Sequence, residues 1–231
     1  MSDIRAVIFD MDGCLVDSEP MSLHTLAELM AAEGLDTTID DLRRTFLGVS
    51  IQSIVSHIAE ALDRDDLPHF AQDFETRLLA RYPEELRVIP SIPALLDDLA
   101  ARGVAIAIAT GSSVHRLGVT LRVAGLADRF GANIFSADQV RHGKPAPDLF
   151  LLAADRLGIP PQACAVMEDS PHGITGARAA GMRAVGFTGG SHLAGMQADH
   201  ARRLTDAGAA VVLPDLDGML GALLDRQPTD G

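Results

Sequence analysis

The sequence predicts an α/β protein in which a doubly wound parallel sheet carries an all-helical segment inserted after its first strand. Three observations indicate this fold. Short apolar and β-branched runs recur along the chain, bounded by Gly, Pro or Asp. Most of them are separated by stretches whose apolar residues have helical spacing. One long segment, residues 18–86, contains helical patterns only.

Six runs have the composition of buried strands. They are too apolar to leave one face in water, which is typical of a parallel sheet covered by helices on both sides. Helical stretches between them end at Gly103, Gly125 and Gly158, and glycine suits a helix C-terminus. This alternation favours a Rossmann-like core. The predicted strands span residues 4–9, 104–109, 132–135, 163–167, 184–187 and 210–213.

The segment after the first strand offers three helical stripes. One lies in residues 21–33, a second follows Ser50, which suits an N-cap, and a third covers residues 70–78. An insert of this kind interrupts the alternation of strands and helices.

The insert leads us to expect two domains. Residues 1–17 and 87–231 would form the Rossmann-like catalytic core, and residues 18–86 would form a helical cap. Ligands of doubly wound sheets bind at the carboxyl ends of the strands. An insert leaving from that edge would therefore act as a lid over the site.

The chain is strongly acidic, with a formal net charge of −13 over 231 residues. It lacks the positive field that nucleic acids and anionic membranes attract, so we expect neither as a partner. An anionic substrate would need a local cation or a nest of N–H groups. There is no signal-peptide pattern and no apolar run of the ~20 residues that span a membrane. We expect a soluble, cytoplasmic protein, a monomer or weak homo-oligomer, with Cys14 and Cys164 reduced.

The stretch VIFDMDGCLVDSEP places two acids directly after the first predicted strand. Asp10 ends the apolar run, and Asp12 follows two residues later. One carboxylate can attack a substrate while the other handles the proton. Acids after a strand also serve as simple turn formers. This motif alone leaves both interpretations open.

Two further stretches carry candidate phosphate-binding residues. ATGSS places Thr110 at a strand tip and Gly111 and Ser112 at the start of a helix, where backbone N–H groups suit a phosphate. A plain helix N-cap by Ser112 or Ser113 is the alternative. Lys144 is the only lysine among eighteen arginines, which indicates a position that requires a compact ammonium group. A surface lysine before a turn is the alternative.

A last pair of acids, Glu168 and Asp169, ends another predicted strand. Together with Asp10 and Asp12 they would crowd one cleft with negative charge unless a cation joined them. Hard oxygen ligands in an open site select Mg²⁺. A capping Asp169 beside a solvated Glu168 is the alternative.

The combined stretches FDMDGCLVDSEP, ATGSS, GKPAPDLF and MEDSPHGI resemble the four motifs of the haloacid dehalogenase superfamily. The resemblance is to its hydrolase branch with a helical cap, which includes β-phosphoglucomutase-like proteins and sugar-phosphate phosphatases. It implies that Asp10 forms an aspartyl phosphate and that Asp12 acts as acid and base. It also implies that Thr110 and Lys144 hold the phosphoryl group.

The resemblance further implies an Mg²⁺ site and a function. The ligands would be Asp10, the Asp12 carbonyl, Glu168 and Asp169. The expected activity is Mg²⁺-dependent hydrolysis of a small phosphorylated metabolite: a sugar phosphate, a sugar-acid phosphate such as 6-phosphogluconate, or a polyol phosphate. True dehalogenases resemble this pattern but lack the second acid, which is present here as Asp12.

Two alternative functions stay open at this point. A β-phosphoglucomutase-type phosphomutase would resemble the chain closely, but its cap histidine and arginine match Ser22 and Ile51 here. A non-enzymatic phosphate-binding or receiver-like module is a distant alternative, because receiver domains are shorter and carry the phosphoacceptor on a later strand.

The residues that would read the substrate are less well defined. Candidates in the predicted cap are Ser18, Glu19, Ser50 and Arg77. His192 and His200 stand eight residues apart, a spacing unlike that of a metal-binding pair, and we expect no metal role for them.

Overall fold

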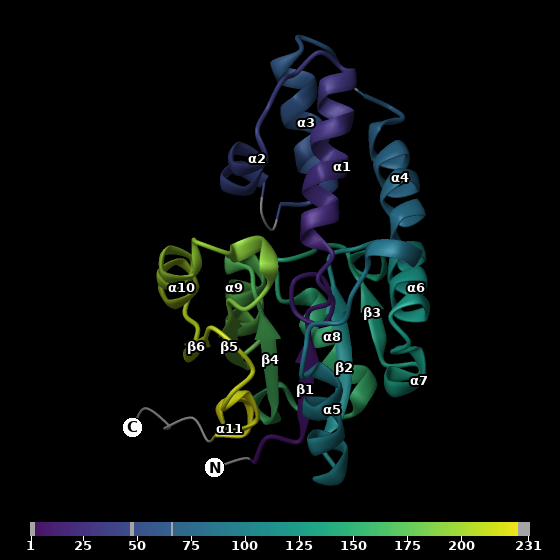
Figure 1. Cartoon of the computed structure of the whole chain (residues 1–231). Helices are drawn as coiled ribbons and strands as arrows, with labels where there is room; N and C mark the ends of the chain where they lie inside the picture. The colour runs from purple at the N-terminus through teal and green to yellow at the C-terminus, as the bar shows by residue number, and fades with distance from the viewer. Residues whose placement is uncertain (1–2, 47–48, 66, 226–231) are drawn as a thin grey trace. The chain divides into compact units, whose positions relative to one another are not determined.

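The computed structural model describes residues 3–46, 49–65 and 67–225. The chain divides into two compact units, one formed by Met1–Asp17 and Arg87–Gly231 and the other by Ser18–Leu86. We call the first the core unit and the second the helical insert (Figure 1). Within the described residues, no helix is both long enough and apolar enough to cross a membrane.

The core unit is built on a six-stranded parallel sheet, as the sequence predicts (Figure 1). The strand order is β3-β2-β1-β4-β5-β6. Each predicted run forms one strand, with ends that differ by at most two residues. The strands are β1 (Ala6–Phe9), β2 (Ala105–Thr110), β3 (Ile134–Ser136), β4 (Cys164–Glu168), β5 (Arg183–Phe187) and β6 (Val211–Leu213).

The strand order places a topological switch between β1 and β4. The chain runs outward from β1 to β3, then returns to place β4 on the other side of β1. Phe9, the last residue of β1, lies beside Ile108 of β2 and Met167 of β4. All the carboxyl ends therefore meet at one edge, which is the edge at which doubly wound sheets bind ligands.

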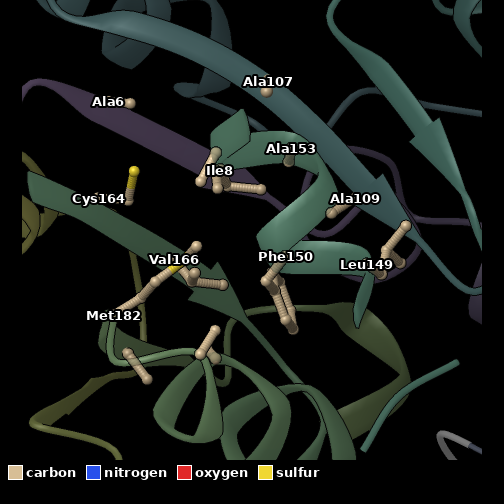
Figure 2. Packing of buried hydrophobic residues seen from close by; sticks show 14 of the residues in the cluster. Ala6, Ile8, Ala107, Ala109, Leu149, Phe150, Ala153, Cys164, Val166 and Met182 are labelled. Carbon is tan, nitrogen blue, oxygen red and sulfur yellow. The ribbon is translucent and has the colours of Figure 1, made fainter. Parts of the chain in front are cut away.

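Helices cover the sheet because its strands are apolar on both faces. In one cluster, Phe150 and Ala153 of α8 are fully buried with Ile8 of β1 and Val166 of β4 (Figure 2). Burial of a side chain such as Phe150 contributes about 1.5–3 kcal/mol. The small Ala109 in the same cluster leaves room for close packing. The core helices are α5 (Ile92–Ala101), α6 (Val114–Val123), α7 (Ala127–Phe130), α8 (Asp148–Leu157), α9 (Pro171–Ala179), α10 (Gln197–Asp206) and α11 (Met219–Leu224).

The helical insert contains the three predicted helices and one that the pattern did not reveal. The predicted ones are α1 (Glu19–Ala32), α3 (Ile51–Ala61) and α4 (Phe70–Glu85), and the additional one is α2 (Ile39–Phe46). Only Leu42 and Phe46 of α2 are buried, so its apolar stripe is too narrow to recognise. Thr38 starts it by accepting a hydrogen bond from the Asp41 N–H at 3.1 Å.

Arg81 ties two helices of the insert together. This residue of α4 lies 3.2 Å from the Glu28 carboxylate and 3.3 Å from the Thr25 hydroxyl, both on α1. It also pairs with Glu85 within α4 at 3.1 Å. Its guanidinium therefore has a structural role inside the insert.

Candidate active site

The loop after β1 brings the first acid into the core unit. Asp10 follows β1 directly, and its backbone N–H donates to the Met167 carbonyl of β4 at 3.0 Å. The chain then turns at Gly13, whose φ of +78° is in the left-handed region that favours glycine. A side chain at Gly13 would overlap the Asp169 carboxylate. The loop is thus packed directly against the end of β4.

Lys144, the only lysine, lies in the middle of the acidic residues. Its ammonium group donates to Asp10 Oδ1 at 2.6 Å and also pairs with Glu168 Oε1. The same nitrogen is 5.3 Å from the centre of the buried Phe150 ring. Burial opposes the charged form of the amine, but the two carboxylates outweigh it and raise the pKa of Lys144. The side chain is therefore a fixed ammonium ion.

Glu168 ends β4 and is fully buried. Its Oε2 accepts from the Ser170 N–H at 2.9 Å, while Oε1 is held by Lys144. Gly173 in α9 leaves the space that this carboxylate fills, since a side chain there would overlap it. Glu168 is thus not the solvated residue of the alternative interpretation.

Asp169 is contacted by two buried histidines, His192 and His200, for which the sequence spacing predicted no metal role. His192 Nε2 lies 3.2 Å from Asp169 Oδ2, and His200 Nε2 lies 2.6 Å from the Asp169 carbonyl oxygen. Burial lowers the pKa of His200, which favours the neutral ring. His192 follows β5 at the same sheet edge as the other site residues, and that position was the signal available in the sequence.

The carboxylates form a cluster that fits a hard cation. Ligand atoms of Asp10, Cys14 and Asp169 all lie within 4.8 Å of one another. Glu168 is buried beside them, so three acidic side chains share one ammonium group, that of Lys144. A divalent cation would add the positive charge that such a cluster lacks. Burial and the neighbouring acids raise the pKa of Asp10, against the effect of Lys144. A bound cation would relieve this crowding of acidic groups.

The thiol of Cys14, which lies next to the reacting loop in the sequence, is close to these acids in the structure. Burial raises its pKa well above the usual range, and the surrounding carboxylates add to the shift. The group is thus a neutral thiol. Burial also raises the pKa of Cys164, to about 11, and neither cysteine is in a disulfide.

Asp12 is held by residues of the next β–α unit. Its Oδ2 accepts from the Ser112 hydroxyl, and its Oδ1 accepts from the Arg116 guanidinium, each at 2.7 Å. Both side chains of this ion pair are mostly buried. Arg116, in the first turn of α6, was not among the predicted residues because nothing in its local pattern differs from that of a surface arginine.

The loop after β2 carries the other predicted phosphate-binding residues. Thr110 is buried, and its hydroxyl oxygen accepts from the Ser112 N–H at 3.1 Å. Gly111 is exposed. Ser113 is the N-cap of α6 and accepts from the Arg116 N–H at 3.0 Å, so capping belongs to Ser113. Thr110 and Ser112 thus reach the same sheet edge as the acids.

The candidates in the helical insert have clear local positions. Ser18 is buried at the start of α1, and Glu19 is partly buried in its first turn. Ser50 is the N-cap of α3 and accepts from the Ser53 N–H at 3.2 Å. Arg77 is exposed on α4.

The chain is similar to proteins with named activities. It is 31% identical to a phosphorylated carbohydrates phosphatase of Thermotoga maritima, over 79% of this chain and 84% of that protein. It is 33% identical to the beta-phosphoglucomutase of Bacillus subtilis, over 83% of this chain and 87% of that protein.

A solved structure and a family model agree with this likeness. A HAD family hydrolase from Deinococcus radiodurans, with bound phosphate and sodium, has a TM-score of 0.75 at 33% identity, covering 96% of this chain and 99% of that one. Residues 4–181 match the model of the haloacid dehalogenase-like hydrolases, a span that includes the loops after β1, β2 and β4. With this match, the fold and the resemblance of the four motifs lead to one conclusion: the chain belongs to the haloacid dehalogenase-like hydrolase family.

Proposed function

We propose that this protein is an Mg²⁺-dependent phosphatase that hydrolyses a small phosphorylated metabolite through an aspartyl phosphate on Asp10. The substrate class is a sugar, sugar-acid or polyol phosphate. The observation that best supports the proposal is the contact of Asp10 with Lys144, at 2.6 Å, where Asp10 follows β1 at the switch between β1 and β4. The relative named as a phosphatase of phosphorylated carbohydrates supports the substrate class.

Asp10 would act as the nucleophile. A carboxylate oxygen of Asp10 forms a bond to phosphorus while the bond to the alcohol oxygen of the substrate breaks. Water then attacks phosphorus, inorganic phosphate leaves, and the carboxylate is restored. Lys144 fixes the Asp10 carboxylate and places positive charge beside the phosphoryl group, where negative charge develops during transfer.

The oxygen-rich cluster suits Mg²⁺, which would be held by Asp10 and Asp169 with Glu168 close by. When bound, the ion would balance the charge of the carboxylates and of the phosphoryl group. The Asp12 carbonyl, which the family resemblance adds as a ligand, belongs to the same proposal. The helical insert would be the cap that reads the rest of the substrate, with Ser18, Glu19, Ser50 and Arg77 as candidates.

Asp12 would handle the proton. It gives a proton to the leaving alcohol oxygen in the first step and takes one from water in the second. Ser112 and Arg116 hold its two oxygens, which fixes the carboxylate at the sheet edge next to Asp10. Arg116 is thus expected to position the acid and base.

The first prediction concerns this proton transfer. Asp12→Asn should lower kcat by roughly 10²–10⁴-fold for an alkyl phosphate, because the leaving alkoxide is no longer protonated. The loss should be smaller in a nitrophenyl phosphate assay, since nitrophenolate leaves without a proton. Equal losses on both substrates would contradict the role of Asp12.

The second prediction concerns the metal. Asp169→Asn should weaken Mg²⁺ binding in calorimetry by more than the roughly 10–100-fold that outer-shell partners typically contribute. Without metal it should unfold at the parent's temperature or higher, because one of the crowded carboxylates has become neutral. At 100 times its Kd, Mg²⁺ should stabilise the parent by about 2.7 kcal/mol and the variant by much less.

Asp155→Asn is the matched control, because Asp155 is an exposed acid of α8. It should bind Mg²⁺ as the parent does. An inactive Asp169→Asn protein with parental Mg²⁺ affinity would show that the metal binds elsewhere.

A phosphomutase is the second candidate, because the Bacillus subtilis beta-phosphoglucomutase is a relative over most of both chains. A mutase must hold a bisphosphate and return the phosphoryl group from Asp10 to a second hydroxyl. The positions that match the cap histidine and arginine of mutases are Ser22, buried in α1, and Ile51, the first residue of α3. Loss of a charged contact to a second phosphate costs about 1.5–3 kcal/mol.

The third prediction separates the two activities. Sugar or polyol monophosphates should release stoichiometric inorganic phosphate, without stimulation by a sugar bisphosphate, because water is the favoured acceptor. A coupled assay should find negligible conversion of β-glucose 1-phosphate into glucose 6-phosphate. Conversion that exceeds phosphate release and depends on the bisphosphate would favour the mutase.

A further inference from the structure

Two histidines on separate elements meet the same residue, Asp169. His192 lies in the turn Ser191–Leu193 after β5, and His200 lies in α10. Both are 1% exposed. His192 approaches the carboxylate of Asp169 at 3.2 Å, and His200 contacts its backbone carbonyl at 2.6 Å. The side chain and the main chain of one acid are therefore contacted by different imidazoles.

The chain around His192 leaves space for the imidazole next to Asp169. A side chain at Gly190 would come within 2.5 Å of His192 Cε1 and 2.6 Å of its Nδ1. A side chain at Gly13 would come within 2.9 Å of the same Cε1 and would overlap Asp169. The loops after β1 and β5 thus both carry glycine where the imidazole reaches the acid.

The chemistry of the His200 contact defines its role. A carbonyl oxygen only accepts hydrogen bonds, so His200 must donate through Nε2–H. Its Nδ1 is buried and has no hydrogen-bond partner among the described residues. The hydrogen bond to the Asp169 carbonyl is therefore the polar contact that this buried ring makes.

His192 approaches the carboxylate group of Asp169. Its Nε2 lies 3.2 Å from Asp169 Oδ2, at ion-pair distance. A ring in this position restricts the rotation of the carboxylate. Ligands of metal ions are commonly fixed in this way by outer-shell partners.

We propose that His192 and His200 are positioning residues that hold Asp169 in the orientation in which it binds the cation. His200 fixes the peptide group, and His192 fixes the carboxylate. Neither ring has to touch the metal or the substrate. This inference rests on the metal site of the proposed function and assigns a role to two residues outside the four motifs.

The test replaces each histidine by Leu, which fills space without a polar nitrogen, and by Gln, whose amide nitrogen can take the place of Nε2. Mg²⁺ affinity of the metal-free proteins is measured by calorimetry, and thermal unfolding is followed in EDTA and in excess Mg²⁺. His192→Leu and His200→Leu should bind Mg²⁺ about 10–100-fold more weakly than the parent. The Gln variants should bind close to the parental level.

His69→Leu and His69→Gln are the controls, since His69 is exposed and makes no side-chain cap hydrogen bond at the start of α4. Both should match the parent in Mg²⁺ affinity. Unfolding in EDTA shows which variants are folded. If His200→Leu is not folded, the test uses the two His192 variants and His200→Gln.

The outcomes separate this inference from the proposed function. A parent that does not bind Mg²⁺ would overturn the metal site and the inference with it. A parent that binds Mg²⁺, with folded Leu variants of equal affinity, would overturn only the positioning role. Gln variants as weak as the Leu variants would also overturn it, because shape and not the donor would then matter.

Discussion

The pairing of Lys144 with Asp10 and Glu168 is the interaction on which the rest of the site depends. Three carboxylates at the ends of β1 and β4 are buried, and one ammonium ion stands between two of them. Buried charges are costly unless they are paired and hydrogen-bonded. In the proposed function, a divalent cation offsets the acidic side chains that Lys144 does not balance. An acidic chain can in this way process an anionic substrate.

The parallel sheet makes this arrangement possible. The order of the strands brings residues that are distant in sequence to one edge, so that Asp10, Thr110 and Glu168 each follow or end a neighbouring strand. Small residues then set the distances. Gly13 leaves room for the carboxylate of Asp169 and Gly173 for that of Glu168, where any side chain would overlap them.

Much of the core was predictable from sequence because strong local patterns encode it. Each of the six apolar runs forms a strand, and Asp10, Lys144 and Glu168 come together at the carboxyl edge of the sheet, as the fold predicts. The α2 helix was missed because it buries only Leu42 and Phe46. The partners of Asp12 and Asp169 were not predictable in the same way, because Arg116 and His200 meet them through tertiary packing. The position of His192 after β5 could be read from the sequence. No spacing rule, however, marks a histidine at that position as a contact of Asp169.

In the proposed mechanism, Asp10 becomes phosphorylated during turnover. The most direct test is the stereochemical course at phosphorus, measured with a phosphorothioate ester that carries sulfur and two different oxygen isotopes on phosphorus and is hydrolysed in water labelled with the third oxygen isotope. Two successive in-line displacements, first by Asp10 and then by water, should give retention of configuration. Inversion would show that water attacks the substrate directly, and would contradict a covalent role for Asp10.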